Sequence, residues 1–238
     1  MKLDILAIGV HPDDIEISAA GTIMKHIDAG YKVGLLDLTQ GELGTRGSAA
    51  IRVEEAQAAA VKMGVQFRHI LKMADGFFEN NREHQLQIVQ ILRTYQPEII
   101  LCNALNDRHP DHGRSSKLVS DACFLSGLIK VESEFEGNKQ EAWRPKAVYH
   151  YMQDRYIKPD FLVDITGYLE SKESVLRCYR SQFYNENSGE PSTYISTPEF
   201  FNSIRHRAAE FGRQIGVQYA EAYNVERLFG VKNLFDLI

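Results

Sequence analysis

Cysteine is scarce in this 238-residue chain, and the three cysteines that occur are isolated from one another. Cys102, Cys123 and Cys178 form no CxxC pair, so the sequence indicates neither a disulfide framework nor a cysteine zinc site. Long apolar runs are also missing. The first run contains Asp4 and stops at His11, which is too short for a signal peptide, and no later run approaches the ~20 residues of a membrane span. We therefore expect a cytoplasmic protein with no membrane partner.

Positive charge is the second deficit of the sequence. The chain has 27 Lys and Arg against 32 Asp and Glu, which gives a formal net charge of -5 at pH 7. A protein that binds nucleic acid needs a clustered basic surface to neutralise phosphates, and no such cluster is present. We therefore expect a small-molecule partner and no nucleic acid.

Apolar runs of strand length alternate with helix-period segments along the chain. The expected strands are 3–10, 32–38, 68–73, 97–102, 146–152 and 161–165, and the expected helices are 17–29, 49–63, 83–95, 114–126, 167–180 and 198–215. This order is typical of a mostly parallel sheet flanked by helices. We predict a single Rossmann-like α/β domain over residues 1–238, with its site at the carboxyl ends of the strands.

Two similar clusters follow two of these strands, "HPDD" at 11–14 and "HPDH" at 109–112. Both fall at the edge of the sheet where the parallel strands end, so we expect their side chains to meet in one crevice. A catalytic zinc commonly takes three N or O ligands and leaves one position for water. We predict His11, Asp14 and His112 as the ligands of one Zn²⁺ per subunit, in a set that also accepts Fe²⁺ or Co²⁺.

Three polar residues of the two clusters remain for chemistry if the metal takes the other three. Asp13 is placed to accept a proton from the attacking water. His109 is expected on the opposite side of the substrate, as an imidazolium that stabilises an oxyanion or protonates a leaving amine. The carboxylate of Asp111 is expected to hold that ring in its charged form. The set indicates metal-assisted hydrolysis of an amide or an ester.

Arginines near the two clusters are candidates for binding a negatively charged substrate, although a single arginine is more often a solvated or salt-bridging surface residue. Arg46, Arg52, Arg108 and Arg114 lie close to them in sequence, and a guanidinium matches a carboxylate at two points. A dicarboxylate such as malate would suit them, with Arg52 and Arg108 as the first candidates. Glu42 either bonds a sugar hydroxyl or caps the structure that follows it.

Several motifs together resemble the PIG-L/LmbE-like family of zinc-dependent N-deacetylases. They are "HPDD" followed by Glu16, "LTQGELGTRG" at 38–47, "RVEEAQAAAVKMGV" at 52–65 and "DRHPDH" at 107–112. Within the family they look most like the bacillithiol-biosynthesis deacetylases that act on N-acetylglucosaminyl malate. The second half is similar more loosely, through residues 172–182 and 219–227. The resemblance implies an N-deacetylase that forms a homo-oligomer, a hexamer or a trimer.

The same resemblance implies roles for individual residues. It assigns the metal ligands and the roles of Asp13 and His109 as above, and it implies that Arg52 and Asp75 contact the substrate. Mycothiol-pathway relatives place a tyrosine where this chain has Asp107. Tyr194 resembles a tyrosine that assists the carbonyl oxygen in some relatives, although a loop tyrosine is equally a surface or interface residue.

Three functions remain open on the sequence. The first is deacetylation of N-acetylglucosaminyl malate in bacillithiol synthesis. The second keeps the chemistry but takes another N-acetylglucosamine-containing substrate, such as a chitooligosaccharide. The third is a metal-containing binding module without turnover, which is disfavoured because mere binding does not need the nonligand groups Asp13, His109 and Asp111.

Overall fold

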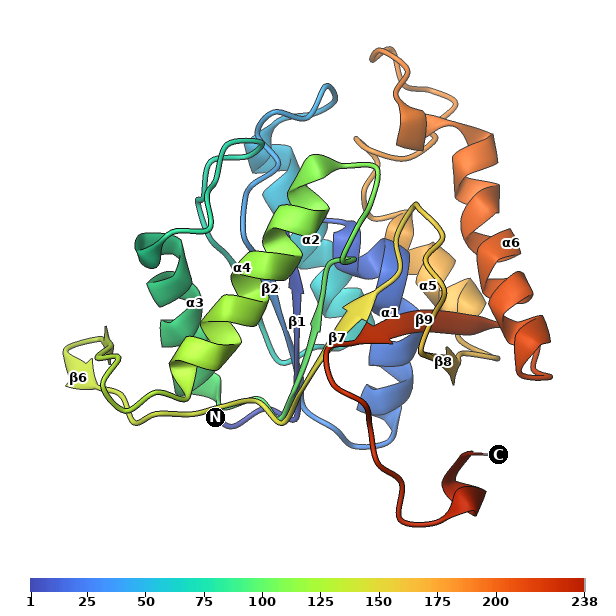
Figure 1. Ribbon diagram of the computed structural model, residues 1–238. Helices are drawn as coiled ribbons and strands as arrows, with labels where there is room; N and C mark the ends of the chain where they lie inside the picture. The colour runs from blue at the N-terminus through green and yellow to red at the C-terminus, as the bar shows by residue number, and fades with distance from the viewer. Residues whose placement is uncertain (238) are drawn as a thin grey trace.

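A seven-stranded sheet forms the centre of the molecule in the computed structural model, which describes residues 1–237 (Figure 1). The strand order is β3-β2-β1-β4-β7-β9-β8. The bounds are β1 (Ile5–Gly9), β2 (Val33–Asp37), β3 (Arg68–Ile70), β4 (Ile99–Cys102), β7 (Ala147–Tyr151), β8 (Phe161–Asp164) and β9 (Ala220–Val225). Strands β5 (Glu134–Phe135) and β6 (Asn138–Lys139) form a separate hairpin. The predicted single α/β domain with a mostly parallel sheet is confirmed.

Helices cover both faces of this sheet (Figure 1). Helices α1 (Asp14–Asp28), α2 (Ala49–Met63) and α5 (Leu169–Leu176) contact one another, and α3 (Arg82–Tyr95) contacts α4 (Pro110–Ser126). Alternate residues of one strand enter different cores, as period-two side-chain direction requires. Ala7 of β1 packs in the core that contains Ile15 of α1, whereas Leu6 and Ile8 pack in the core that contains Leu118 of α4.

The parallel part of the sheet places two distant loops side by side. Strand β1 pairs in parallel with both β2 and β4, and Ile5 lies opposite Val33 on one side and Ile99 on the other. The chain runs from β1 outward to β3 on one side and resumes at β4 on the other, so the strand order reverses between β1 and β4. Ligands bind in the crevice at such a switch point. The two His-Pro-Asp clusters leave the sheet there.

The far end of the sheet differs from the sequence prediction. Strand β9 was not predicted, and it runs antiparallel to both β7 and β8. The sequence does not indicate this strand, because its second residue is the charged Glu221 although almost all of its residues are buried. The carboxylate is paired with the buried Lys172 ammonium at 2.6 Å, which removes the penalty that a lone buried charge would carry. Helix α6 (Pro198–Gln214) packs against β9.

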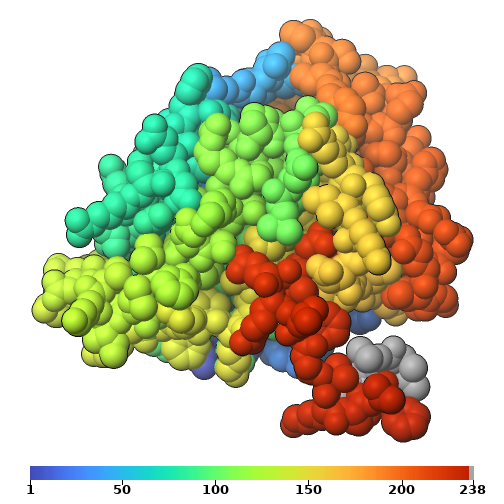
Figure 2. All heavy atoms as spheres, viewed as in Figure 1, coloured from blue at the N-terminus to red at the C-terminus, as the bar shows by residue number. Residues whose placement is uncertain are grey.

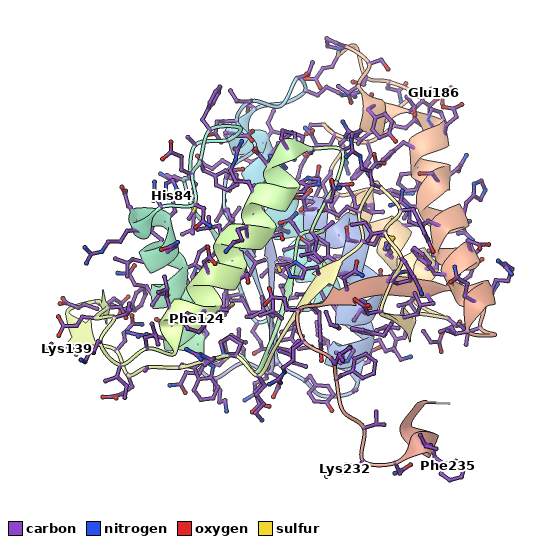
Figure 3. The ribbon with its side chains drawn as sticks, in the orientation of Figure 1. His84, Phe124, Lys139, Glu186, Lys232 and Phe235 are labelled. Atoms are coloured by element: carbon purple, nitrogen blue, oxygen red, sulfur yellow. The ribbon has the colours of Figure 1, made fainter. Side chains whose placement is uncertain are left out.

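Two segments extend from this body. Figure 3 shows Glu186 in the segment between α5 and α6, at the end of the molecule where the loop after β2 also lies. The stretch after β9 leaves the opposite end and carries a short 3-10 helix, η2 (Leu234–Leu237), which stands apart from the body in Figure 2. Among the described residues, no helix is long and apolar enough to cross a membrane.

Candidate active site

The loop from β1 into α1 carries the first cluster in a constrained conformation. Asp13 is the residue before helix α1. Its backbone has φ 115° and ψ −25°, in the left-handed region that residues other than glycine rarely adopt. Such strain is concentrated at functional sites, where the surrounding structure enforces it. The carboxylate of Asp14 accepts the main-chain N–H groups of Val10 and His11 at 3.2 and 3.0 Å. The loop is therefore tied around Asp14.

The loop from β4 into α4 carries the second cluster. His109 is the residue before the helix, and its ring Nδ1 accepts the main-chain N–H of Asp111 at 3.3 Å. Pro110 occupies the first helical position, where its missing N–H costs nothing. His112 therefore lies in the first turn of α4, where it is buried and faces the first cluster.

Three imidazole rings and one carboxylate meet between the two loops. The ring centroid of His11 lies 4.8 Å from that of His109 and 5.8 Å from that of His112. The Asp14 carboxylate lies between the rings of His11 and His112, which we call the outer imidazoles. Its oxygens are 3.6 Å from Nδ1 of His11 and 3.2 Å from Nε2 of His112. One nitrogen from each of His11, His109 and His112 lies within 4.8 Å of the others, a spacing that a metal ion could bridge. The donors are the N and O atoms that a catalytic zinc site uses.

The charges of this cluster are strongly coupled. Burial alone would raise the pKa of Asp14, but the neighbouring imidazoles of His112 and His11 outweigh it and hold that pKa well below its usual range. Burial raises the pKa of Asp13 to about 7, against the opposing effect of the Arg52 guanidinium. A general base with a pKa near the working pH is the most effective kind.

The cluster forms the floor of a pocket of about 220 Å³. Drug-sized ligands occupy pockets of roughly 300 to 1,000 Å³, so this one suits a ligand the size of a single small ring with a short substituent. Ile17, Ile195 and Phe200 provide apolar wall, while Gln153 and Gln182 add amide groups to the lining. Apolar and hydrogen-bonding surfaces side by side match an amphipathic sugar.

Comparison with known proteins places this geometry in a family. The family model described as GlcNAc-PI de-N-acetylase (PIG-L) matches residues 6–123. A diacetylchitobiose deacetylase from Thermococcus kodakarensis is 30% identical over 227 residues, which cover 91% of this chain and 80% of that protein. The chain belongs to the PIG-L family. This membership confirms the predicted class of enzyme, the deacetylases that hydrolyse amides.

Solved structures similar to this PIG-L chain differ in the reaction that their names describe. The N,N'-diacetylchitobiose deacetylase from Pyrococcus horikoshii has a TM-score of 0.80 and 27% identity, covering 98% of this chain and 88% of its own. The 4-carboxy-2-hydroxymuconate hydratase from Pseudomonas putida has a TM-score of 0.77 and 21% identity, covering 98% and 100%. At that identity the hydratase shows only that the fold is shared.

Arg52 reaches the predicted site in the PIG-L chain, but it contacts protein groups. Its Nη2 donates to the carboxylate of Asp13 at 3.0 Å and to the carbonyl of Pro12 at 2.6 Å, and its Nη1 donates to the carbonyl of Gly41 at 3.4 Å. The side chain is almost completely buried. Arg52 therefore holds Asp13 in place. It also lines the pocket, and its predicted contact with the substrate stays a prediction.

Asp75 was expected to contact the substrate, and Glu42 either to bond a sugar hydroxyl or to cap the structure that follows it; the two residues contact each other. Asp75 lines the pocket, and its Oδ1 lies 2.9 Å from Nε2 of His11. Its Oδ2 accepts the N–H of Leu43 at 3.0 Å. Glu42 accepts the N–H of Asp75 at 2.8 Å, which favours the capping interpretation of Glu42.

Asp111 meets His109 through a different group from the one predicted. The main-chain N–H of Asp111 reaches the ring, whereas its carboxylate accepts the N–H of Gly76 at 2.8 Å and pairs with Arg114 at 2.8 Å. Burial and the two neighbouring imidazoles lower the pKa of His109. The free ring is therefore biased toward its neutral form, not toward the imidazolium expected from the sequence.

Tyr194 and Arg108 lie together at the rim of the pocket. The Tyr194 hydroxyl donates to Asp154 at 2.9 Å, and the Arg108 guanidinium stacks over the tyrosine ring at 4.3 Å and donates to Asp154 at 3.1 Å. Arg108 lines the pocket, and 45% of its side chain is exposed. It is the best placed of the four arginines to meet a substrate from the rim.

Sequence reasoning missed three residues that hold the cluster. Asn103 and Gln153 both donate to the carboxylate of Asp14, each at 3.0 Å, and Asp107 bonds to the ring of His112. Asn103 follows β4 directly and Gln153 follows β7 by two residues, so their only signal was a polar residue at the carboxyl end of a buried strand.

Proposed function

We propose that this chain is a metal-dependent N-deacetylase that removes the acetyl group from an N-acetylglucosamine unit at the end of a short saccharide, such as a chitooligosaccharide. One observation carries the proposal: His11, Asp14 and His112 converge next to Asp13 and His109 on the floor of a pocket that suits one sugar ring. The remainder of a short saccharide would extend past the rim.

The donor set fits a divalent ion, with Zn²⁺ expected and Fe²⁺ or Co²⁺ as alternatives. His11, Asp14 and His112 would hold the ion, and it would supply Lewis-acid chemistry by polarising the acetyl carbonyl and lowering the pKa of water. Asp14 is kept ionised by its imidazole neighbours, as a metal ligand must be.

The other residues of the floor divide the proton transfers and the oxyanion contact between them. Asp13 accepts a proton from the attacking water, and Arg52 holds its carboxylate against the pocket. Nδ1 of His109 accepts a main-chain N–H, so Nε2 of the neutral ring carries the proton. His109 thus presents a hydrogen-bond donor to the oxyanion, and the proton that Asp13 has taken from the attacking water passes to the departing nitrogen.

The arginines argue against a dicarboxylate as the main substrate. Arg46 is buried and bonds to Ser181, Ser188 and Glu190, and Arg114 is paired with Asp111. Arg52 is committed to Asp13, as described above. A neutral saccharide, as in the name of the Thermococcus relative, therefore fits the pocket better than malate does.

A second candidate is the glycoside that the sequence resemblance suggested. Arg108 remains exposed at the rim, and one guanidinium is enough to meet one carboxylate of N-acetylglucosaminyl malate. On this hypothesis the chain is a deacetylase of bacillithiol synthesis.

Acetate release from three substrates tests the proposal. N,N'-diacetylchitobiose, N-acetylglucosaminyl malate and free N-acetylglucosamine are compared by kcat/KM with the zinc-loaded protein. We expect the chitobiose to be the best substrate and Arg108→Gln to change its kcat/KM less than tenfold. A preference for the malate glycoside that Arg108→Gln abolishes would establish the second candidate instead. No acetate from any N-acetyl sugar would refute both.

A further inference from the structure

The two outer imidazoles of the cluster share an arrangement that neither the sequence nor the family relationship assigns. Each ring has one nitrogen facing Asp14 and the other nitrogen facing a second carboxylate. His11 directs Nδ1 to Asp14 at 3.6 Å and Nε2 to Asp75 at 2.9 Å, with an oxygen of Asp111 farther from the same Nε2 at 3.6 Å. His112 directs Nε2 to Asp14 and Nδ1 to Asp107, at 3.2 and 2.5 Å. Each ring is therefore held between Asp14 and another carboxylate, but Asp14 faces Nδ1 of His11 and Nε2 of His112.

We infer that Asp75 and Asp107 are positioning residues that fix the tautomers of His11 and His112, so that a metal ion is bound through Nδ1 of His11 and Nε2 of His112. A carboxylate accepts the N–H of one ring nitrogen, so the lone pair lies on the other nitrogen. This inference rests on the metal centre of the proposed function. It moves Asp75 from sugar binding to support of the metal ligand.

Main-chain contacts show that both carboxylates are held rigidly for this task. Oδ2 of Asp75 accepts the N–H of Leu43, which leaves Oδ1 for His11. Oδ1 of Asp107 accepts the N–H groups of Asp154 and Arg155 at 3.1 and 2.7 Å, which leaves Oδ2 for His112. Both acids are at least nine-tenths buried, so water does not compete for the ring N–H groups.

A different arrangement of the same atoms is the alternative. His11, Asp75 and Asp111 also bring a nitrogen and two carboxylate oxygens within 4.8 Å of one another, so Asp75 could itself be a ligand, through Nε2 of His11. Two observations favour the positioning role. The 2.9 Å separation of Asp75 from His11 is that of a hydrogen bond. The Asp111 carboxylate is already occupied by Gly76 and Arg114.

Asparagine substitutions test the inference because one oxygen of each acid accepts main-chain N–H groups and the other faces an imidazole. This difference decides which way the amide of the asparagine faces. In Asp75→Asn or Asp107→Asn, the carbonyl oxygen keeps the main-chain hydrogen bonds, so the fold is preserved. The NH₂ group then faces the imidazole and forces its proton onto the nitrogen that should bind metal. Asp154→Asn is the matched control, since this acid lines the same pocket and, within residues 1–237, its side chain bonds to no imidazole.

Zinc affinity by chelator competition and imidazole ¹⁵N shifts of the zinc-saturated protein, in which the ligand rings are neutral, are the readouts. We expect one zinc ion per chain in the wild type, a loss of affinity of about 10- to 100-fold in Asp75→Asn and in Asp107→Asn, and an unchanged affinity in Asp154→Asn. The ¹⁵N shifts should show the opposite tautomer of His11 in the first variant and of His112 in the second.

Two results would overturn the inference while leaving deacetylation intact. One is wild-type affinity and unchanged tautomers in both variants. The other is complete loss of metal from Asp75→Asn at saturating zinc, because Asp75 would then be a ligand. Wild-type protein that binds zinc but releases no acetate would refute the proposed reaction alone, since neither readout needs a substrate.

Discussion

Replacing Gly41 with alanine should inactivate the enzyme through Arg52. Gly41 has φ 64°, and a Cβ built there would lie 2.7 Å from Cζ of Arg52, closer than real Cβ atoms come to other atoms. The guanidinium sits at the end of a flexible side chain and can withdraw. It would then give up its bonds to Asp13 and to the carbonyl of Pro12.

The magnitude has two parts, which a second glycine separates. A left-handed alanine costs about 1–2 kcal/mol, and a lost hydrogen bond to a charged group costs about 1.5–3 kcal/mol. Gly30 has φ 91° with no atom within 4 Å of its built Cβ, so Gly30→Ala carries the backbone cost alone. With the backbone cost and the loss of the charged Arg52–Asp13 bond counted together, we expect Gly41→Ala to lose about 2.5–5 kcal/mol of stability. Each kcal/mol lowers Tm by about 2–4 °C in a chain of this size.

Activity separates the two variants more sharply than stability does. A misplacement of about 1 Å at a catalytic group can reduce turnover by about 10²-fold, so kcat for acetate release should fall by that factor in Gly41→Ala. Gly30→Ala should keep the wild-type kcat below its Tm. Equal kcat values for the two variants would show that Arg52 does not hold Asp13 for catalysis.

Two further changes test other parts of the structure. Asp13→Asn should keep stoichiometric zinc by elemental analysis while kcat falls about 10²- to 10⁴-fold, and an unimpaired kcat would exclude Asp13 as the base. Burial lowers the pKa of His150, but Cys102, Glu226 and the Asn103 carbonyl outweigh it and raise that pKa to about 11. The unfolded ring titrates near pH 6.5, so stabilisation by the charged ring is complete below that pH and declines as the pH rises toward 11. Urea unfolding should show the stability difference between wild type and His150→Gln shrinking between about pH 6 and about pH 9, and a constant or growing difference would contradict the charged ring.

Most of the fold followed from local patterns in the sequence. Buried parallel strands read as continuous apolar runs, and "LDILAIGV" is such a run, so β1 and its neighbours were predictable. Strand β9 was not, because its buried Glu221 is neutralised by Lys172, which lies 49 residues away in the sequence. No local pattern carries that information.

The candidate site was also predictable only in part. The convergence of His11 and His112 was predictable, because both follow parallel strands and therefore emerge at one edge of the sheet. The partners of each side chain were not, since they depend on distances of an ångström or less. Arg52 and Asp75 were expected to contact the substrate; both line the pocket, and the structure also bonds them to Asp13 and His11, which the sequence did not indicate. The hexamer or trimer and the identity of the ion remain predictions.

The adjacency of β1 and β4 has a consequence for how the protein reaches its native state. The residues proposed to hold the ion come from loops almost a hundred positions apart, and they meet only after the two strands have paired. A ligand that binds only the native chain shifts the folding equilibrium toward it. Zinc bound there should crosslink the first and second quarters of the polypeptide. Chelators should therefore lower the melting temperature of the protein as well as its turnover.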